Sequence, residues 1–203
     1  MLVAFGVYGL LAGPTKQTDE ASTPIPTAPA ASTPGATPTP PQPTVPAVRG
    51  SRDPETFASN VALALFTWDT TTGLMPLDYT AALLDVGDPT GQEQAGLAAD
   101  IATYLPTRDA WIDLRQYATT QTLTIDSLQV PTSWNEAVKQ AHPGQLPEGA
   151  VAYTIHGTRQ RDGVWNGQLT SANRDVAFTV FVACPPGETC HLLRLSQLDN
   201  PLD

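Results

Sequence analysis

The residues from Val176 to Ala183 form an almost unbroken apolar run, and a second apolar run begins at Leu192 after a Pro-Pro-Gly turn. Successive side chains of a β-strand point to opposite faces, so both faces of the first run are largely apolar. This composition is typical of a strand that is covered on both sides. We therefore expect a terminal β-hairpin whose first strand lies in the core.

The two cysteines of the chain, Cys184 and Cys190, flank the turn of that hairpin. Their spacing suits a disulfide across the neck of the hairpin, which requires an oxidising compartment. A pair of free buried thiols and a metal or redox role are the alternatives. The metal alternative is disfavoured because His142 and His156 lie in other segments, and His191 points to the opposite strand face from Cys190. We expect no metal and no cofactor.

The formal net charge of −10 is placed unevenly along the chain. Residues 1–50 carry two basic and two acidic residues, whereas residues 51–203 carry 8 basic and 18 acidic ones, so the second part holds the whole net charge. An acidic domain repels phosphate backbones. Direct binding of nucleic acid is therefore not expected.

The chain starts with an uncharged, mostly apolar stretch, residues 1–13, that a Pro/Thr-rich segment follows at residues 14–50. A helix of the first stretch reaches only about 20 Å, which is short of a hydrocarbon core of about 30 Å. It also lacks the basic start of a secretory signal. We expect the outer part of a transmembrane anchor whose beginning is missing; a buried helix or strand is the alternative. Ten of the twenty prolines lie between Pro14 and Arg49, which predicts a disordered linker.

A folded domain is expected over residues 51–203, and its first part has helical periodicity. Asp53 is a suitable N-cap and Pro54 a suitable first residue for a helix that extends to about Trp68. Three further helical segments are predicted, one after Asp78, one over residues 94–104 and one that Thr107 caps.

After these helices the apolar period changes to that of strands. The residues from Gln121 to Val130 predict a strand with a bulge near Asp126, and a short helix is expected within residues 131–142. Ala150 to Arg161 predicts a second strand that turns at Asp162-Gly163, and residues 166–174 are expected to be a loop or an edge. Helices followed by an antiparallel sheet define an α+β domain.

Five stretches of the sequence carry a family resemblance: F-A-x-x-V-A-x-A-L-F-T-W-D-T at 57–70, L-L-D-V-x-D-P-T-G at 83–91, Y-T-I-H-G-T-R at 153–159, V-A-F-T-V-F-V-A-C at 176–184 and C-H-L-L-R-L-S-Q-L-D-N-P-L at 190–202. The chain resembles actinobacterial conjugative-element proteins that are related to the TcpC conjugation proteins. The layout is also similar to the nuclear-transport-factor-2-like cone, in which N-terminal helices lie in the concavity of a bent sheet.

The resemblance implies a single-pass protein of the cell membrane with its globular domain on the extracytoplasmic side. This domain would act as a scaffold in a type IV secretion-like channel for conjugative DNA transfer. The implied partners are other conjugation-channel proteins, with homo-oligomers left open. TcpC proteins carry two such domains in tandem, whereas this chain has room for one.

Two alternatives to the scaffold come from other functional classes. A tethered module that binds or senses a ligand outside the cell is one. A cone-fold enzyme is the other, because this fold also hosts ketosteroid isomerases. The carboxyl and phenol groups that an enzyme would draw on are Asp100, Asp113, Asp126, Tyr104, Tyr117 and Tyr153. Any sequence of this composition offers as many such groups, so we expect no catalytic residue.

Overall fold

A computed structural model describes residues 43–203 of the chain, so the expected anchor (1–13) and most of the expected linker lie outside the described residues. The elements along the chain are α1 (Pro54–Phe66), β1 (Trp68–Asp69), the 3-10 helix η1 (Thr70–Thr72), α2 (Pro76–Leu84), α3 (Gln94–Ala102), α4 (Arg108–Arg115), β2 (Thr120–Gln129), α5 (Thr132–Gln140), β3 (Ala150–Trp165), β4 (Gln168–Ala183) and β5 (His191–Leu195). The expected α+β class is confirmed.

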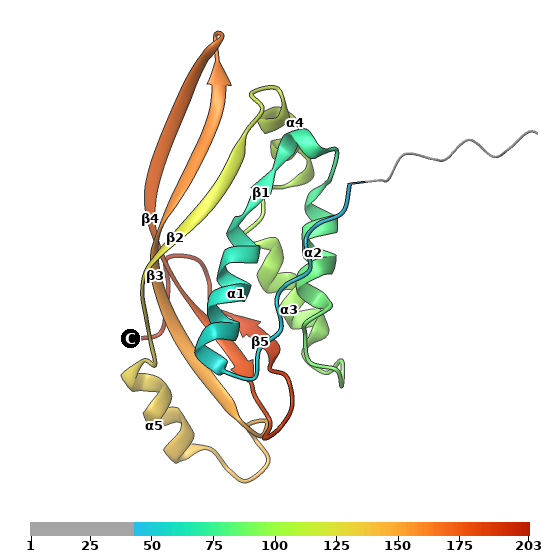
Figure 1. Cartoon of the computed structure of the whole chain (residues 1–203). Coiled ribbons are helices and arrows are strands. Elements are labelled where there is room, and N and C mark those ends of the chain that lie inside the picture. Colours follow the sequence, from blue (N-terminus) through green and yellow to red (C-terminus); the bar gives the residue numbers. More distant parts are fainter. Residues whose placement is uncertain (1–42) are drawn as a thin grey trace, which may run out of the picture. The chain divides into compact units, whose positions relative to one another are not determined.

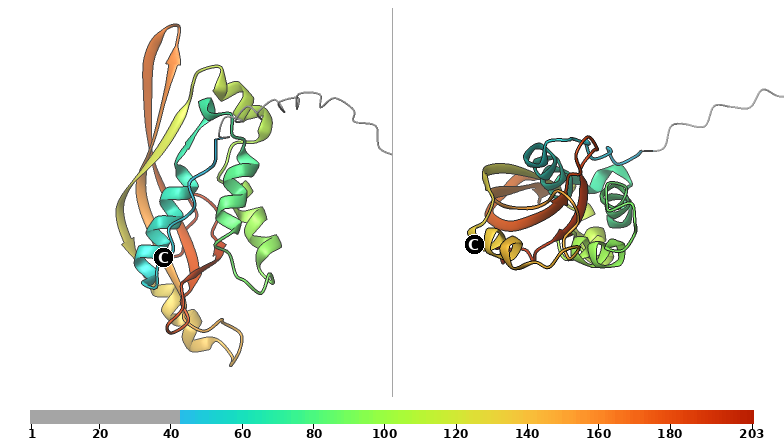
Figure 2. Two further views of the ribbon diagram at one scale, coloured as in Figure 1. Left: turned by 45° about the vertical axis from the view of Figure 1, so that its right-hand side comes forward. Right: turned by 90° about the horizontal axis from the view of Figure 1, so that it is seen from below.

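The strands form a five-stranded sheet in the order β1-β2-β3-β4-β5, and every neighbouring pair is antiparallel. The sheet is strongly curled, and α1, α2, α3 and α4 pack on its concave face (Figures 1 and 2). The predicted bulge is present, because the register of β2 against β3 shifts between Ile125 and Ser127.

Two helices, α1 and α4, start at the capping residues that the sequence predicts, whereas the predicted cap of α2 is wrong. The Asp53 carboxylate accepts a hydrogen bond from the Thr56 backbone N–H at 2.8 Å, and the Thr107 hydroxyl oxygen accepts one from the Ala110 N–H at 3.3 Å. Helix α2 starts at Pro76, two residues before the expected cap, and the Asp78 carboxylate accepts a hydrogen bond from the Met75 N–H at 2.7 Å. These contacts satisfy N–H groups that the first helical turn leaves without a partner.

Helix α1 ends two residues earlier than expected, at Phe66. Trp68 instead pairs with Gln121 in the short strand β1. Its ring packs between Trp111, with ring centroids 5.0 Å apart, and the Arg161 guanidinium at 5.2 Å. Sheet pairing and these two contacts hold Trp68 in the core outside the helix.

The second half of β4, residues 176–183, is covered on both faces, as its apolar run predicts. Val176, Phe178, Val180 and Val182 are buried in the main core together with α1. On the other face, α5 and the C-terminal segment lie over the sheet. The Trp134 and Phe181 ring centroids are 5.9 Å apart, and the Leu202 N–H donates to the Thr179 hydroxyl at 2.8 Å.

The predicted turn at Asp162-Gly163 is wrong, and of the two alternatives expected for residues 166–174, a loop or an edge, the structure shows the edge of the sheet beyond the turn. Strands β3 and β4 pair without interruption from Ala150↔Ala183 to Trp165↔Gln168, and the turn is Asn166-Gly167. Both turn residues have positive φ, 48° and 75°, which is the conformation that a two-residue hairpin turn needs and that Asn-Gly adopts readily. The Asp162 carboxylate accepts hydrogen bonds from the Ser171 hydroxyl across the strands and from the Gln160 amide on β3 itself.

The end of the expected linker contacts the domain. Val48 is buried in the core, and the Asn60 side-chain amide donates to the Arg49 carbonyl oxygen at 3.0 Å. The core therefore includes residues before the expected boundary at Ser51. No helix within residues 43–203 has both the length and the apolar character needed to span a bilayer.

Candidate functional site

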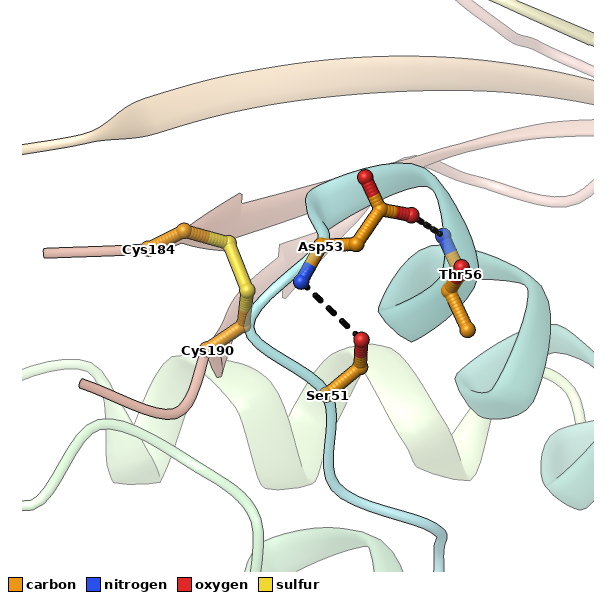
Figure 3. The surroundings of a disulfide bond; sticks show 5 residues. All are labelled: Ser51, Asp53, Thr56, Cys184 and Cys190. Atoms are coloured by element: carbon orange, nitrogen blue, oxygen red, sulfur yellow. Dashed lines mark hydrogen bonds between the residues drawn. A yellow bond between two sulfur atoms is a disulfide. The ribbon is translucent and has the colours of Figure 1, made fainter. Parts of the chain in front are cut away.

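The expected disulfide joins Cys184 and Cys190 at the neck of the β4–β5 hairpin (Figure 3). The Cys190 N–H donates to the Ser51 carbonyl oxygen at 2.8 Å, and the Ser51 hydroxyl oxygen accepts from the Asp53 N–H at 3.0 Å. The disulfide-bonded turn is thereby attached to the start of α1. This arrangement is structural, and both sulfur atoms are occupied by the bond.

Two of the residues that an enzyme would draw on, Asp100 and Tyr104, are held in structural hydrogen bonds, and a third, Tyr153, lies in the core. Asp100 accepts two hydrogen bonds from the Arg194 guanidinium, at 2.6 and 3.1 Å, and one from the Leu195 N–H at 3.1 Å. The Tyr104 hydroxyl donates to the Ser196 carbonyl oxygen at 2.7 Å, and burial raises the pKa of Tyr104 far above its ordinary value. Burial also raises the pKa of Tyr153.

The other three residues are Asp126 in β2, Asp113 in α4 and Tyr117 just after α4. Asp126 occupies the β2 bulge and accepts a hydrogen bond from the Thr158 hydroxyl at 3.2 Å. Tyr117 follows α4 and packs its ring against Trp165, with centroids 5.1 Å apart. Asp113 lies in the wall of a groove that also contains Tyr104. Across residues 43–203 no three His, Cys, Asp or Glu side chains gather in a way that could hold a metal ion.

The groove lies between α4 and the outer half of β3 and contains a pocket of about 450 Å³. Its walls are residues 103–106, side chains of α4, Arg159 and Arg161 of β3, and Leu198. It continues into a second hollow of about 210 Å³, which shares Leu114 and Arg161 with the first and ends at Tyr117 and Trp165. The groove is thus basic at one end and aromatic at the other.

The basic character of the groove comes from the register of the β3–β4 hairpin. Arg159 and Arg161 are two residues apart and share the face of β3 that carries Ile155, and Arg174 of β4 pairs directly with Arg159. Like charges that face each other across two strands repel. Burial and the charge of Arg174 lower the pKa of Arg159, and burial and the charge of Arg159 lower the pKa of Arg161.

Two of these three arginines have partners. Arg174 forms an ion pair with Asp199 at 2.8 Å. The Arg161 Nε–H donates to the Gln121 side-chain oxygen at 2.8 Å, and its guanidinium lies over the Trp68 ring. Arg159 has neither a side-chain hydrogen bond nor an ion pair with any other residue of the described part, 43–203.

A cavity of about 690 Å³, larger than the groove pocket, lies elsewhere, between residues 44–49, α1, α2 and the ends of β1 and β2. Its wall is mainly apolar, and its charged residues, Arg49 and Asp69, are of opposite sign. Trp68 lines this cavity too, but its buried Nε1–H has no hydrogen-bond partner among the residues described. The concentration of like charge that marks the groove is not found in this cavity wall.

Sequence reasoning did not identify the three arginines. A signal was present for two of them, because Tyr153, Ile155, Gly157, Arg159 and Arg161 continue one face of the same strand with a period of two. Arg174 ends the segment expected to be a loop or an edge, and nothing in the sequence indicated its register opposite Arg159.

The described residues thus define an α+β domain in which helices pack on a curled antiparallel half-barrel sheet, with a basic groove along its outer hairpin. Comparisons of the chain with models of protein families, with curated proteins and with solved structures find no match.

Proposed function

We propose that the chain is a non-enzymatic, membrane-tethered scaffold that helps to assemble a conjugative, type IV secretion-like channel for DNA transfer. The proposal starts from the resemblance of the stretches at 57–70 and 176–184 to TcpC-related proteins. In this proposal the N-terminal apolar residues anchor the chain and the acidic domain lies outside the cytoplasm. The oxidised pair Cys184–Cys190 is consistent with such a compartment.

The proposed fold family is the nuclear-transport-factor-2-like cone. A strongly curled sheet with α1 and its neighbours on the concave face supports this assignment (Figure 2). The core contacts between α1 and the strands β3 and β4 support it as well, because they place Phe57, Val61 and Phe66 against Ile155 and Phe178 in one cluster.

The observation that carries the scaffold proposal is the outer end of the β3–β4 hairpin, which extends beyond the helices (Figure 1). Leu169 is 89% exposed and Trp165 is 56% exposed at this end. Residues 168–175 of β4 have a neighbouring strand on one side only, since β5 pairs with β4 over Val180–Ala183. Exposed apolar side chains beside an open strand edge favour contact with another protein.

Site-specific photo-crosslinking in donor cells tests this proposal. A photoreactive amino acid at Leu169 is expected to cross-link to conjugation-channel proteins. The same amino acid at Leu77 of α2 is the matched control, because Leu77 is also strongly exposed, at 79%, but lies away from the hairpin. Cross-links of equal yield from both positions, or none from Leu169, would contradict the proposal.

A transfer assay gives the functional measurement. Leu169→Ser removes an exposed apolar contact without opening a cavity, so the thermal unfolding midpoint should stay near that of the original chain while DNA transfer falls. Leu77→Ser should leave both quantities unchanged. Normal transfer by a Leu169→Ser, Trp165→Ser double variant that folds would count against a role of the hairpin.

The second candidate is a tethered ligand-binding module, which the basic groove favours. Its pocket of about 450 Å³ has the size of a small-molecule site. A cone-fold enzyme draws less support, because Asp100 and Tyr104 are already engaged by Arg194, Leu195 and Ser196.

A further inference from the structure

Arg159 forms no ion pair and no side-chain hydrogen bond with any residue of the described part, 43–203, although the Asp199 carboxylate, which is paired with Arg174, partly offsets its charge. It is partly buried and directly opposite Arg174, whose own charge is taken by Asp199. Moving a cation away from water has a free-energy cost that an ion pair or a hydrogen bond normally offsets. Among residues 43–203 no such contact to the Arg159 guanidinium exists, so its donor groups are available to an anion that enters the pocket.

Arg161 supplies a second, already oriented donor group. Its Nε–H is bound to Gln121 and its guanidinium rests over Trp68, so few rotamers remain open to it. Donors that are held in place before binding lose less conformational entropy when a ligand arrives. Arg159 and Arg161 line the same pocket, where a carboxylate can accept hydrogen bonds from both.

The apolar residues that line the pocket indicate what the uncharged part of the ligand should be. Leu105, Pro106, Ala110, Leu114 and Leu198 give the same pocket an apolar lining beside the arginines. Tyr104 adds ring surface but no free donor, because its hydroxyl donates to the Ser196 carbonyl oxygen. A ligand that carries one carboxylate on an apolar body can bind the arginines and also contact the apolar residues.

Asp113 in the wall sets a limit on the charge of the ligand. It forms no ion pair with Arg159 or Arg161, so its negative charge remains in the pocket wall. A dianion such as phosphate meets stronger repulsion from this carboxylate than a monoanion does. The geometry therefore favours a singly charged group.

We propose that the pocket between α4 and β3 binds small monocarboxylates with an apolar body, and that Arg159 and Arg161 hold the carboxylate. The inference concerns the groove and does not rest on the conjugation role, which depends on the hairpin end. The same chemistry is offered by a free small molecule and by the C-terminal carboxylate of a peptide, and the experiment separates these two sources.

The experiment is an NMR titration of the full chain with four probes: benzoate, benzamide, inorganic phosphate and a short apolar peptide with a free C-terminus. Benzoate is expected to shift the Arg159 and Arg161 Nε–H signals with a dissociation constant of about 1 mM or tighter. Benzamide has the same shape without the charge and should shift them much less. Phosphate, as the dianion, should bind more weakly than benzoate.

The variant Arg159→Gln should weaken benzoate binding about tenfold or more, because a charge-assisted hydrogen-bond pair is lost. Its thermal unfolding midpoint should be no lower than that of the original chain, since Arg159 has no structural partner within 43–203 and its repulsion with Arg174 disappears. Arg52→Gln is the matched control: Arg52 is exposed on the surface, outside the groove, and its replacement should leave binding unchanged. Ala110→Leu fills the pocket without changing any charge and should also abolish binding.

Each result decides the inference. Loss of the benzoate shifts in both Arg159→Gln and Ala110→Leu, with Arg52→Gln unaffected, supports it. Shifts that persist in Arg159→Gln, shifts of equal size with benzamide, tighter binding of phosphate, or no shifts with any probe would overturn it. Tighter binding of the peptide than of benzoate identifies a chain terminus as the source of the carboxylate and overturns the assignment to small molecules.

Discussion

Gly149 precedes β3 and lies against the backbone of the residue that begins the disulfide-bonded turn. A Cβ atom at this position would lie 2.2 Å from the Cys184 carbonyl oxygen, and the Cys184 N–H donates to the Gly149 carbonyl oxygen at 3.0 Å. Its φ of 70° also lies in the region that favours glycine. Both features require a residue without a side chain.

Replacement of Gly149 by alanine should therefore destabilise the domain more than the same change at Gly144. Gly144 has a φ of 80° but no atom within 4 Å of a Cβ, so Gly144→Ala isolates the backbone strain, which costs about 1–3 kcal/mol. Gly149→Ala adds the clash with Cys184. Urea denaturation of both variants measures the difference, and equal free energies of unfolding would show that the close approach to Cys184 does not matter.

Residue-scale prediction from the sequence worked where the determining contact is local. Asp53 and Thr107 were identified as caps because each reaches an N–H group three residues further along the chain. Trp68 was misplaced in the first helix because its partners, Gln121, Trp111 and Arg161, come from distant segments. The helical spacing of apolar residues contains no information on contacts with distant segments.

Among the elements, the β4–β5 hairpin depends on its cross-link. The bond between Cys184 and Cys190 closes a short loop, and in the chain-entropy model it contributes about 2–3 kcal/mol by restricting the unfolded chain. The loop also holds the start of α1 through the contact between Cys190 and Ser51. Loss of the disulfide should therefore destabilise both the hairpin and the start of α1.

The double variant Cys184→Ala, Cys190→Ala should lower the free energy of unfolding by about 2–3 kcal/mol and leave the fold intact. Chemical denaturation of the variant and of the original chain, with and without reductant, provides the comparison. The original chain should lose stability when reduced, whereas the variant should not respond. Two free thiols in the mass of the non-reduced original chain would refute the cross-link.

Element boundaries were predictable where turn chemistry and side-chain period agreed. The long β3–β4 hairpin shows where they conflicted, because Asp162-Gly163 and Asn166-Gly167 are both favourable turn pairs only a few residues apart. Pairing through Trp165↔Gln168 adds further backbone hydrogen bonds to the hairpin. These additional bonds favour the turn at Asn166-Gly167 over one at Asp162-Gly163. A single-sequence pattern does not contain that difference in pairing.

At the scale of the whole molecule, the proposed membrane tether leads to a prediction about the location and redox state of the protein. In its native cells the protein should sediment with the membrane fraction, and Cys184 and Cys190 should react with maleimide only after reduction. A cytosolic protein with free cysteines from the same cells is the control for reagent access. Recovery of the protein in the soluble fraction with reactive thiols would contradict the tethered, extracytoplasmic arrangement.

The amino-acid sequence by itself determined the α+β class, the helix caps, the buried strand at Val176–Ala183, the bulge near Asp126 and the cysteine pair, because each depends on residues close together in the chain. Only the tertiary structure decided the length of the β3–β4 hairpin and the basic groove beside it. Arg159 and Arg174 are fifteen positions apart and meet through strand register, and residues of α4 line the pocket that contains Arg159. Register and packing depend on the sum of many distant contacts, which no local pattern contains.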